Sequence, residues 1–258
     1  LTRERTSHIP TVLYFHENQI TYPWSLRDRD VQEKRDIHYG FINLSSALAA
    51  DHVLFNSKYH LNSFMTGGKK ILKHFPDHQE LDTIDKIQSK SQILYLGMNL
   101  VQFDAYEEKN EGDPLILWNH RWEYDKNPDS FFHCLYRLHE EDHRFQVAIL
   151  GESFHSVPTI FDEAKSRLEE RIVHYGYCSE FKEYAQWLWK ADILPVTSNQ
   201  DFFGISIMEA IYCGAYPILP RRLTYPELVP DKYHSKHLYD NEDELYELVK
   251  GCIQDIPI

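Results

Sequence analysis

The sequence has few cysteines and no long apolar run. Its four cysteines, Cys134, Cys178, Cys213 and Cys252, lie far apart, and no two form a C-x-x-C pair. This spacing argues against a structural zinc site or a disulfide framework and suits a reducing compartment. No stretch approaches the roughly 18 consecutive apolar residues that a membrane span requires. The polar opening LTRERTSHIP also lacks the apolar core of a signal peptide, so we expect a cytoplasmic protein.

Two further features are missing. No segment repeats at a period of about 20–50 residues, which excludes solenoid and propeller arrays. The chain also opens on a charged segment, without the initial strand and Gly-rich turn of a nucleotide-binding α/β domain. We therefore expect the N-terminal domain to be incomplete in this chain.

The balance of charge is acidic. The chain has 27 Lys and Arg against 40 Asp and Glu, a net charge of −13. Because nonspecific nucleic-acid binding depends on neutralising phosphates, this charge argues against a general polyanion binder. It does not exclude a nucleic-acid partner, since 15 His can protonate locally and a basic patch can lie on an acidic protein. The segment GGKKILKH (67–74) is either such a patch for RNA phosphates or a solvated helix end.

What is present predicts a packed α/β protein. The 258 residues correspond to one large or two small domains, and the 42% hydrophobic and 14% aromatic content is ample for a core. In the first half, short apolar runs predict strands, and three- and four-residue spacing predicts helices. The predicted strands are 11–15, 52–56 and 91–96, and the predicted helices are 31–50 and 58–66, with Ser57 as an N-cap.

The second half alternates more regularly. Its predicted strands are 114–118, 146–150, 171–175, 192–196 and 215–219, and the helices after them are 128–139, 158–170, 180–190, 204–212 and 241–253. Such alternation indicates parallel sheets covered on both faces. The charged, aperiodic segment 104–114 is the expected linker. We predict a partial N-terminal Rossmann-like domain over 1–107 and a C-terminal Rossmann-like domain over 108–258.

Ligands of parallel α/β sheets bind beyond the carboxyl ends of the strands, so polar groups in the loops there are candidates. The loop after strand 11–15 contains His16, Glu17, Asn18 and Gln19. This cluster is either a helix cap or a cleft wall for a polyhydroxylated ligand.

The loop after strand 114–118 contains His120, Arg121 and Lys126, with Pro128 in the first turn of the next helix. An Arg fork, a Lys charge and a positive helix end together suit a diphosphate. The R-x4-K spacing alone is weak, and the strand–loop–helix context is what favours phosphate over a solvated pair.

The segment 197–220 carries the strongest signal. Glu209 lies on the helix that Gly204 opens, among apolar neighbours, and can accept both hydroxyls of a ribose. Asp201, near the positive helix end, can accept hydroxyls of a second sugar. The backbone N–H groups around Phe203, Gly204 and Ile205 are available to phosphate or sugar oxygens. The alternative is an ordinary amphipathic helix whose carboxylate faces solvent.

These segments resemble one family. DFFGISIMEAIYCGAYPILP is similar to the acidic E-x7-E segment of retaining GT-B glycosyltransferases of family four, with Asp201 at the first acidic position, and HRWEYDKNP resembles their diphosphate-binding loop. Together with LYFHENQITYPW and YGFINLSSALAADHVLFNS, they are similar to the tRNA-queuosine α-mannosyltransferases, over about residues 11–228. The resemblance implies a GT-B fold, with two Rossmann-like domains around a cleft.

The resemblance also implies a function. It predicts transfer of mannose from GDP-mannose to the cyclopentenediol of queuosine in tRNA, with retention of configuration and no divalent metal. Arg121 and Lys126 would bind the diphosphate, Glu209 the ribose, Asp201 the donor sugar, and His16 the transferred sugar. Arg221 and Arg222 join Glu17, Asn18 and Gln19 as acceptor-side candidates, with pairing to surface acids as the alternative for the two arginines.

Two other functions keep the same donor loops. One is a GT-B enzyme with another nucleotide-sugar donor and a lipid or small-glycoside acceptor. The other is a non-catalytic nucleotide-sugar-binding module. The sequence alone does not distinguish guanine from uracil in the donor, and it names neither the tRNA species nor a stable protein partner.

Overall fold

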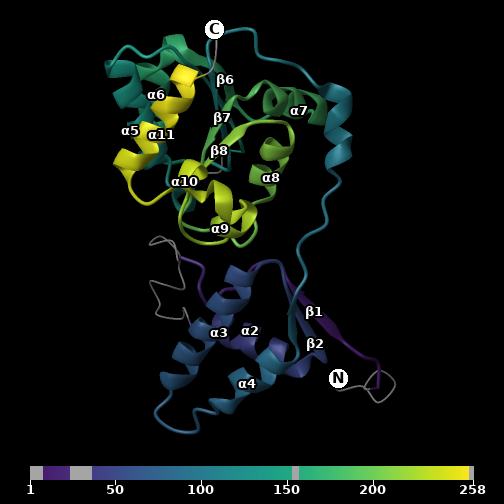
Figure 1. Ribbon diagram of the computed structural model, residues 1–258. Helices are drawn as coiled ribbons and strands as arrows, with labels where there is room; N and C mark the ends of the chain where they lie inside the picture. The colour runs from purple at the N-terminus through teal and green to yellow at the C-terminus, as the bar shows by residue number, and fades with distance from the viewer. Residues whose placement is uncertain (1–7, 24–36, 153–156, 256–258) are drawn as a thin grey trace. The chain divides into compact units, whose positions relative to one another are not determined.

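The structure is a computed structural model that describes residues 8–23, 37–152 and 157–255 (Figure 1). Contacts within the chain divide it into two compact units, Leu1–Gly97 and Met98–Ile258. This division lies ten residues before the domain boundary predicted after residue 107. No helix in these described ranges is long and apolar enough to cross a membrane.

The first unit contains a parallel sheet in the order β1-β2-β3. Its strands are β1 (Val12–Phe15), β2 (His52–Phe55) and β3 (Ser91–Ile93), and its helices are α2 (Ile37–Ala49), α3 (Lys58–Lys73) and α4 (Asp82–Ser89). Ser57 caps α3 as predicted, because its hydroxyl accepts a hydrogen bond from the His60 backbone N–H at 3.0 Å. The core is aromatic, with the Phe15 and Phe55 rings stacked 5.3 Å apart.

Strand β1 differs from the buried strand that its composition predicts. Val12 is 60% exposed, because β1 is an edge strand of the described sheet and has a neighbouring strand, β2, along one edge only. The predicted helix 31–50 begins in residues outside those that the structure describes, and its described part is α2.

The second unit has a six-stranded parallel sheet in the order β6-β5-β4-β7-β8-β9. Its strands are β4 (Leu115–Asn119), β5 (Gln146–Leu150), β6 (Ile172–Gly176), β7 (Ile193–Pro195), β8 (Tyr216–Pro220) and β9 (Leu238–Tyr239). Taken in chain order, this is the 3-2-1-4-5-6 arrangement of Rossmann folds. The order reverses between β4 and β7, and the crevice beyond the carboxyl ends of these two strands is where such sheets bind ligands.

Helices cover both faces of this sheet (Figure 1). The longer elements are α5 (Pro128–Glu140), α6 (Ile160–Arg167), α7 (Phe181–Lys190), α8 (Ile205–Tyr212) and α11 (Glu242–Asp255). The shorter ones are η1 (Leu100–Tyr106), η2 (Tyr124–Lys126), η3 (Glu169–Arg171), α9 (Tyr225–Leu228), η4 (Asp231–Tyr233) and α10 (His234–His237). Helices α5, α6 and α11 pack on one face, and α7 and α8 pack on the other.

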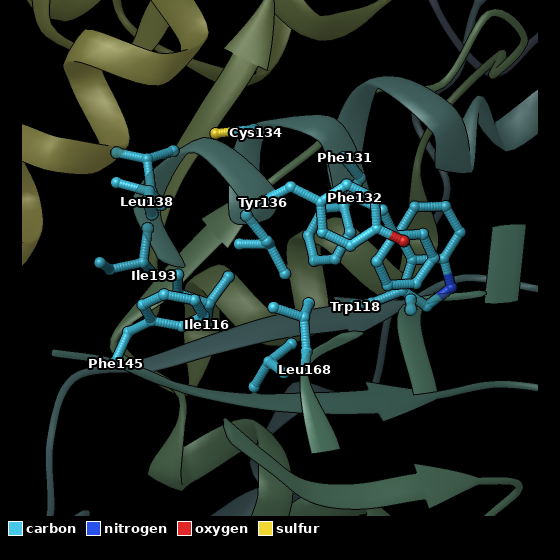
Figure 2. Close-up of a cluster of buried hydrophobic side chains, with 14 of the residues drawn as sticks. Ile116, Trp118, Phe131, Phe132, Cys134, Tyr136, Leu138, Phe145, Leu168 and Ile193 are labelled. Atoms are coloured by element: carbon cyan, nitrogen blue, oxygen red, sulfur yellow. The ribbon is translucent and has the colours of Figure 1, made fainter. Parts of the chain in front are cut away.

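Strand β4 shows why both faces need cover. Ile116 and Trp118 point into the core beneath α5, whereas Leu115 and Leu117 point into the core beneath α7 and α8. Figure 2 shows Trp118 beside Phe131 and Phe132 of α5. The continuous apolar run of the sequence is therefore a strand buried on both sides.

Several short elements of the described residues were not predicted, among them α4, η1 and β9. The first residues of the predicted linker, 104–106, belong to η1. This 3-10 helix forms because Phe103 is fully buried against α7, in the hydrophobic core beneath α7 and α8. Strand β9 was missed because it is two residues long, too short for periodicity to show, and it pairs Leu238 with Leu219 at the sheet edge.

Gly151, directly after β5, lies in close contact with the backbone of the loop that follows β4. Its φ is +126°, and a Cβ at this position would lie 2.0 Å from the backbone oxygen of His120. Trp122 closes the same junction by donating hydrogen bonds from its backbone N–H to Glu152 O at 3.1 Å and from Nε1 to Leu150 O at 3.1 Å. Glycine is therefore what lets the two loops meet.

Gly151→Ala tests this close approach. We expect it to lower the unfolding free energy of the second unit by more than about 3 kcal/mol, because it adds a backbone clash to the strain of a positive φ. Gly176→Ala is the matched control, since Gly176 has a φ of +131° with nothing within 4 Å of its Cβ position. It should cost only about 1 kcal/mol in urea denaturation. Equal costs for the two variants would contradict the clash.

Candidate functional site

Lys126 joins the loops that follow β4 and β7. Its Nζ donates to Gln200 O at 2.8 Å and lies 3.2 Å from both Asp125 Oδ2 and Asp201 Oδ1. The residue is only 7% exposed, so its charge is held by two carboxylates rather than by water. Thr197 strengthens the junction, since its hydroxyl lies 3.0 Å from Lys126 O. The structure thus brings together two of the predicted site residues, Lys126 and Asp201.

The second oxygen of Asp201 is held by a tyrosine. Tyr225, at the start of α9, donates its hydroxyl to Asp201 Oδ2 at 2.6 Å. Burial raises the pKa of Tyr225 well above its usual value, and the neighbouring Asp201 raises it further, so the hydroxyl keeps its proton. Asp201 therefore lies between a cation and a hydroxyl donor, which fixes the orientation of its carboxylate.

His120 is buried beside the start of α8. Its Nδ1 lies 3.4 Å from Ser206 Oγ, and its Nε2 is buried without a hydrogen-bond partner among the described atoms. Burial lowers the pKa of His120 to about 4, so the ring is neutral at pH 7. Buried polar atoms normally have partners, so the unpartnered Nε2 near the carboxyl end of β4 makes His120 a candidate for contact with a ligand.

Helix α8 adds an electropositive end to the same region. Gly204 precedes its first residue with a φ of +86°. Asn119, the last residue of β4, donates Nδ2–H to Ser206 O at 2.7 Å and so ties the helix start to the sheet. The first N–H groups of a helix have no partner within the helix, and they attract anions together with the helix dipole.

Glu209 lies on α8 and is partly buried. Tyr184 of α7 donates its hydroxyl to Glu209 Oε2 at 2.7 Å. Burial raises the pKa of Glu209, and the hydrogen bond from Tyr184 partly opposes this. One oxygen is thus anchored, while the other remains for a ligand with hydroxyl groups.

Tyr184 also lines a cavity of about 420 Å³ at the carboxyl ends of β4, β5 and β6. Tyr177, 67% exposed, and Phe181 contribute aromatic rings to it. The other lining residues are Asn119, Leu150, Gly151, Cys178, Ser179 and Glu180. This volume lies within the range of small-ligand sites. A larger cavity of about 610 Å³ lies at the amino ends of β7 and β8 and includes none of the predicted site residues.

Three predicted cations of the second unit are less enclosed than Lys126. The Arg121 side chain is 48% exposed and lies 3.3 Å from Glu123 Oε2. Arg221 lies 3.1 Å from Asp240 Oδ2, and Arg222 donates to the backbone oxygens of Thr197 and Ser198. The last two therefore brace the loop after β7 and the sheet edge, and their role toward an acceptor stays a prediction.

The predicted cluster of the first unit forms a hydrogen-bonded turn. Asn18 Oδ1 accepts from the backbone N–H groups of Ile20 and Thr21 at 3.0 Å each, and the Gln19 side chain donates to Glu17 Oε1 at 3.1 Å. His16 is exposed, with its ring 4.7 Å from that of Tyr14. Asn18 thus acts as a turn former, while His16 and Glu17 keep exposed side chains.

One group of side chains in the described ranges has atoms suited to a metal. His174, Cys178 and Glu183 bring their ligand atoms within 4.8 Å of one another. His174 Nε2 lies 3.1 Å from Gly176 O and 3.6 Å from Cys178 Sγ, contacts that hold the turn after β6. Burial raises the pKa of Cys178 to about 11, so its thiol is protonated at pH 7.

Sequence reasoning missed the two tyrosines that hold the acidic residues. Tyr184 and Tyr225 lie 25 and 24 residues from their partners, so no local pattern reveals them. It also missed Asp125, which adjoins Lys126 in η2. The sequence shows that Asp125 adjoins Lys126. It does not show that both side chains are buried, because their burial depends on the loop after β7.

Comparison with known proteins decides the family. Residues 102–255 match the model of glycosyl transferases group 1. The chain belongs to this family. In addition to this group 1 segment, residues 1–98 match the model of the tRNA-queuosine alpha-mannosyltransferase N-terminal region.

Among relatives of this group 1 chain, the tRNA-queuosine alpha-mannosyltransferase of Drosophila melanogaster is 37% identical over 243 residues. The match covers 91% of this chain and 62% of the fly protein. The chain therefore spans about three fifths of the length of that relative.

Solved structures show the group 1 fold. The Anabaena protein HepE in complex with UDP-glucose matches with a TM-score of 0.64 and 18% identity, over 95% of this chain and 63% of that one. A UDP-forming α,α-trehalose-phosphate synthase from Burkholderia xenovorans matches with a TM-score of 0.66 and 13% identity, over 96% and 61%. These likenesses confirm the predicted α/β GT-B fold with parallel sheets.

The buried state of His120 predicts a pH dependence of stability. Unfolded histidine binds a proton near pH 6.5, whereas folded His120 binds one only near pH 4. Its stabilising contribution is therefore complete above pH 6.5 and is lost as the pH falls toward 4, by about 3 kcal/mol. Denaturation of the wild type and His120→Gln at pH 4 to 7, followed by Trp fluorescence, should show this contribution only in the wild type. His133→Gln, an exposed change on α5, should retain the wild-type slope, and an equal slope in His120→Gln would contradict the prediction.

Proposed function

We propose that the protein transfers mannose from GDP-mannose to the cyclopentenediol of queuosine in tRNA, with retention of configuration. One observation carries this proposal: residues 1–98 match the N-terminal region of the tRNA-queuosine alpha-mannosyltransferases, and 91% of the chain aligns with a relative of that name. The donor residues of the second unit support it chemically.

The diphosphate is proposed to bind beside Lys126 and the start of α8. Lys126 is already balanced by Asp125 and Asp201, so a phosphate oxygen must replace one of these carboxylates at Nζ. If Asp201 is replaced, its oxygen becomes available to a hydroxyl of the donor sugar, while Tyr225 keeps the carboxylate in place. Arg121 and the neutral His120 Nε2–H supply further donors to the phosphates. Phe203, Gly204 and Ile205 frame the helix end.

The nucleoside is proposed to extend from the phosphates into the 420 Å³ cavity. Glu209 then accepts the ribose hydroxyls with the oxygen that Tyr184 does not hold. Because Tyr184 both lines the cavity and contacts Glu209, the base and ribose positions are adjacent.

The distribution of charge supports an RNA acceptor at the first unit. Of the 27 basic and 40 acidic residues, 12 and 11 lie in residues 1–97, so this unit has a net charge of +1 and the second has −14. The basic segment 67–74 includes the end of α3, where Lys69, Lys70 and Lys73 are not the cations of any ion pair among the described residues. His16 and Glu17 are exposed at the end of β1, where His16 is proposed to contact the transferred sugar and Glu17 the acceptor.

The proposed chemistry needs no protein nucleophile. The acceptor hydroxyl attacks the sugar on the face from which the diphosphate leaves, and a diphosphate oxygen takes the proton. Catalysis then consists of stabilising negative charge on the leaving phosphate, which Lys126, Arg121 and the N-terminus of α8 provide. Such a site does not need a divalent metal to neutralise the phosphates.

The proposal is tested with the full-length protein, because this chain spans only part of its relative. Radiolabelled GDP-mannose is incubated with bulk tRNA that carries or lacks queuosine. We expect label in the queuosine-containing tRNA only.

Two other results would be informative. Binding of GDP-mannose in calorimetry without label in either tRNA would refute the acceptor and direct attention to a lipid or small glycoside. Failure to bind GDP-mannose at all would refute the donor site.

Glu209→Gln tests the ribose contact at constant side-chain size. An amide accepts with one oxygen only, so we expect the affinity for GDP-mannose to fall about tenfold to a hundredfold, with unchanged thermal unfolding. Glu170→Gln, an exposed change within η3, should have no effect. Lys126→Met is less decisive, because removing a buried cation leaves Asp125 and Asp201 uncompensated and should also destabilise the unit by about 3–5 kcal/mol. Unchanged donor affinity in Glu209→Gln would remove this residue from the site.

A further inference from the structure

One carboxylate in the cavity wall has no role in the contacts described so far. Glu180 lines the 420 Å³ cavity and occupies the N-cap position of α7. Its side chain makes no capping hydrogen bond, and no ion pair or side-chain hydrogen bond is found for it among the described residues. Its backbone is fixed, because its carbonyl accepts from the Tyr184 N–H at 3.2 Å. An unused carboxylate on a fixed backbone is suited to a ligand that presents hydrogen-bond donors.

We propose that Glu180 selects guanine as the base of the donor, an inference that rests on the proposed nucleotide-sugar function. Guanine presents two parallel donors on one edge, the ring N1–H and the 2-amino group. An ionised carboxylate accepts both, in a bidentate contact. Uracil presents a single N–H between two carbonyl oxygens, which a carboxylate repels. Adenine presents its amino group beside an unprotonated ring nitrogen, so it too offers one donor.

The position of Glu180 agrees with this role. It lies four residues before Tyr184, and residues at this spacing occupy one face of a helix about 6 Å apart along its axis. Tyr184 in turn holds Glu209, the proposed ribose ligand. One face of α7 therefore carries Glu180, proposed for the base edge, and Tyr184, which fixes the proposed ribose contact. Their order along the helix matches the order of base and ribose in a nucleoside.

The surroundings of Glu180 suit a flat, uncharged ring. Tyr177 and Phe181 flank it in sequence and line the same cavity, and both side chains are exposed enough to offer a ring surface for stacking. Lys126 and Arg121, the proposed phosphate ligands, do not line this cavity. The carboxylate is thus on the base side of the site, where it does not oppose the binding of the phosphates.

The experiment compares GDP, IDP and UDP by calorimetry on the full-length protein. IDP keeps the ring N–H of guanine but lacks the 2-amino group, so it isolates one of the two hydrogen bonds. We expect the wild type to bind GDP best, IDP more weakly and UDP weakest. In Glu180→Gln the affinity for GDP should fall about tenfold to a hundredfold, and the ratio of GDP to IDP affinity should approach one.

Glu183→Gln is the matched control, because it makes the same chemical change on the same helix outside the cavity lining and should keep the wild-type ratio. Thermal unfolding of both variants should equal that of the wild type, and the GDP/IDP ratio is a readout that a merely structural effect would not move. A wild-type ratio in Glu180→Gln, with GDP still preferred over UDP, would overturn the role of Glu180 and leave the proposed donor intact. Tighter binding of UDP than of GDP by the wild type would overturn both.

Discussion

The buried ammonium group of Lys126 is the contact on which the site of the second unit depends. It joins η2, after β4, to the loop after β7, the two loops that flank the point where strand order reverses. A buried cation is costly unless it is paired, so Asp125 and Asp201 both stabilise the folded position of Lys126. In the proposed function, a diphosphate oxygen takes the place of one of these carboxylates beside the ammonium group.

The apolar core makes this arrangement rigid. Trp118 and Trp122 flank the loop after β4, and both side chains are buried among aromatic rings rather than exposed for stacking on a ligand. Their indole N–H groups donate to His120 O and Leu150 O. The backbone of His120 is therefore set by packing beneath the site, and Gly151 allows the neighbouring loop to approach it.

Much of this could be predicted from the sequence, for physical reasons. Strands β4 to β8 are runs of apolar residues separated by helices, and parallel topology places the loops after β4 and β7 at one edge, so Lys126 and Asp201 were predicted to meet a common ligand. Tyr184 and Tyr225 could not be predicted, because a hydrogen bond between distant segments leaves no periodicity. The extent of η1 was missed for a related reason: Phe103 lies just before the charged segment 104–114, and its burial depends on α7, which is distant in sequence.

The uneven distribution of charge has a consequence for how a polyanion meets this chain. Residues 98–258 carry an excess of 14 negative charges, whereas residues 1–97 are close to neutral. Residues 98–258 repel an approaching nucleic acid before the two molecules touch. This repulsion biases the orientation of the encounter complex. Because the Debye length is about 8 Å at physiological ionic strength, the orienting field acts only in the last stage of approach. The proposed nucleotide-sugar donor, by contrast, has to bind to the acidic half itself, so its proposed binding depends on buried cations and helix ends rather than on net charge.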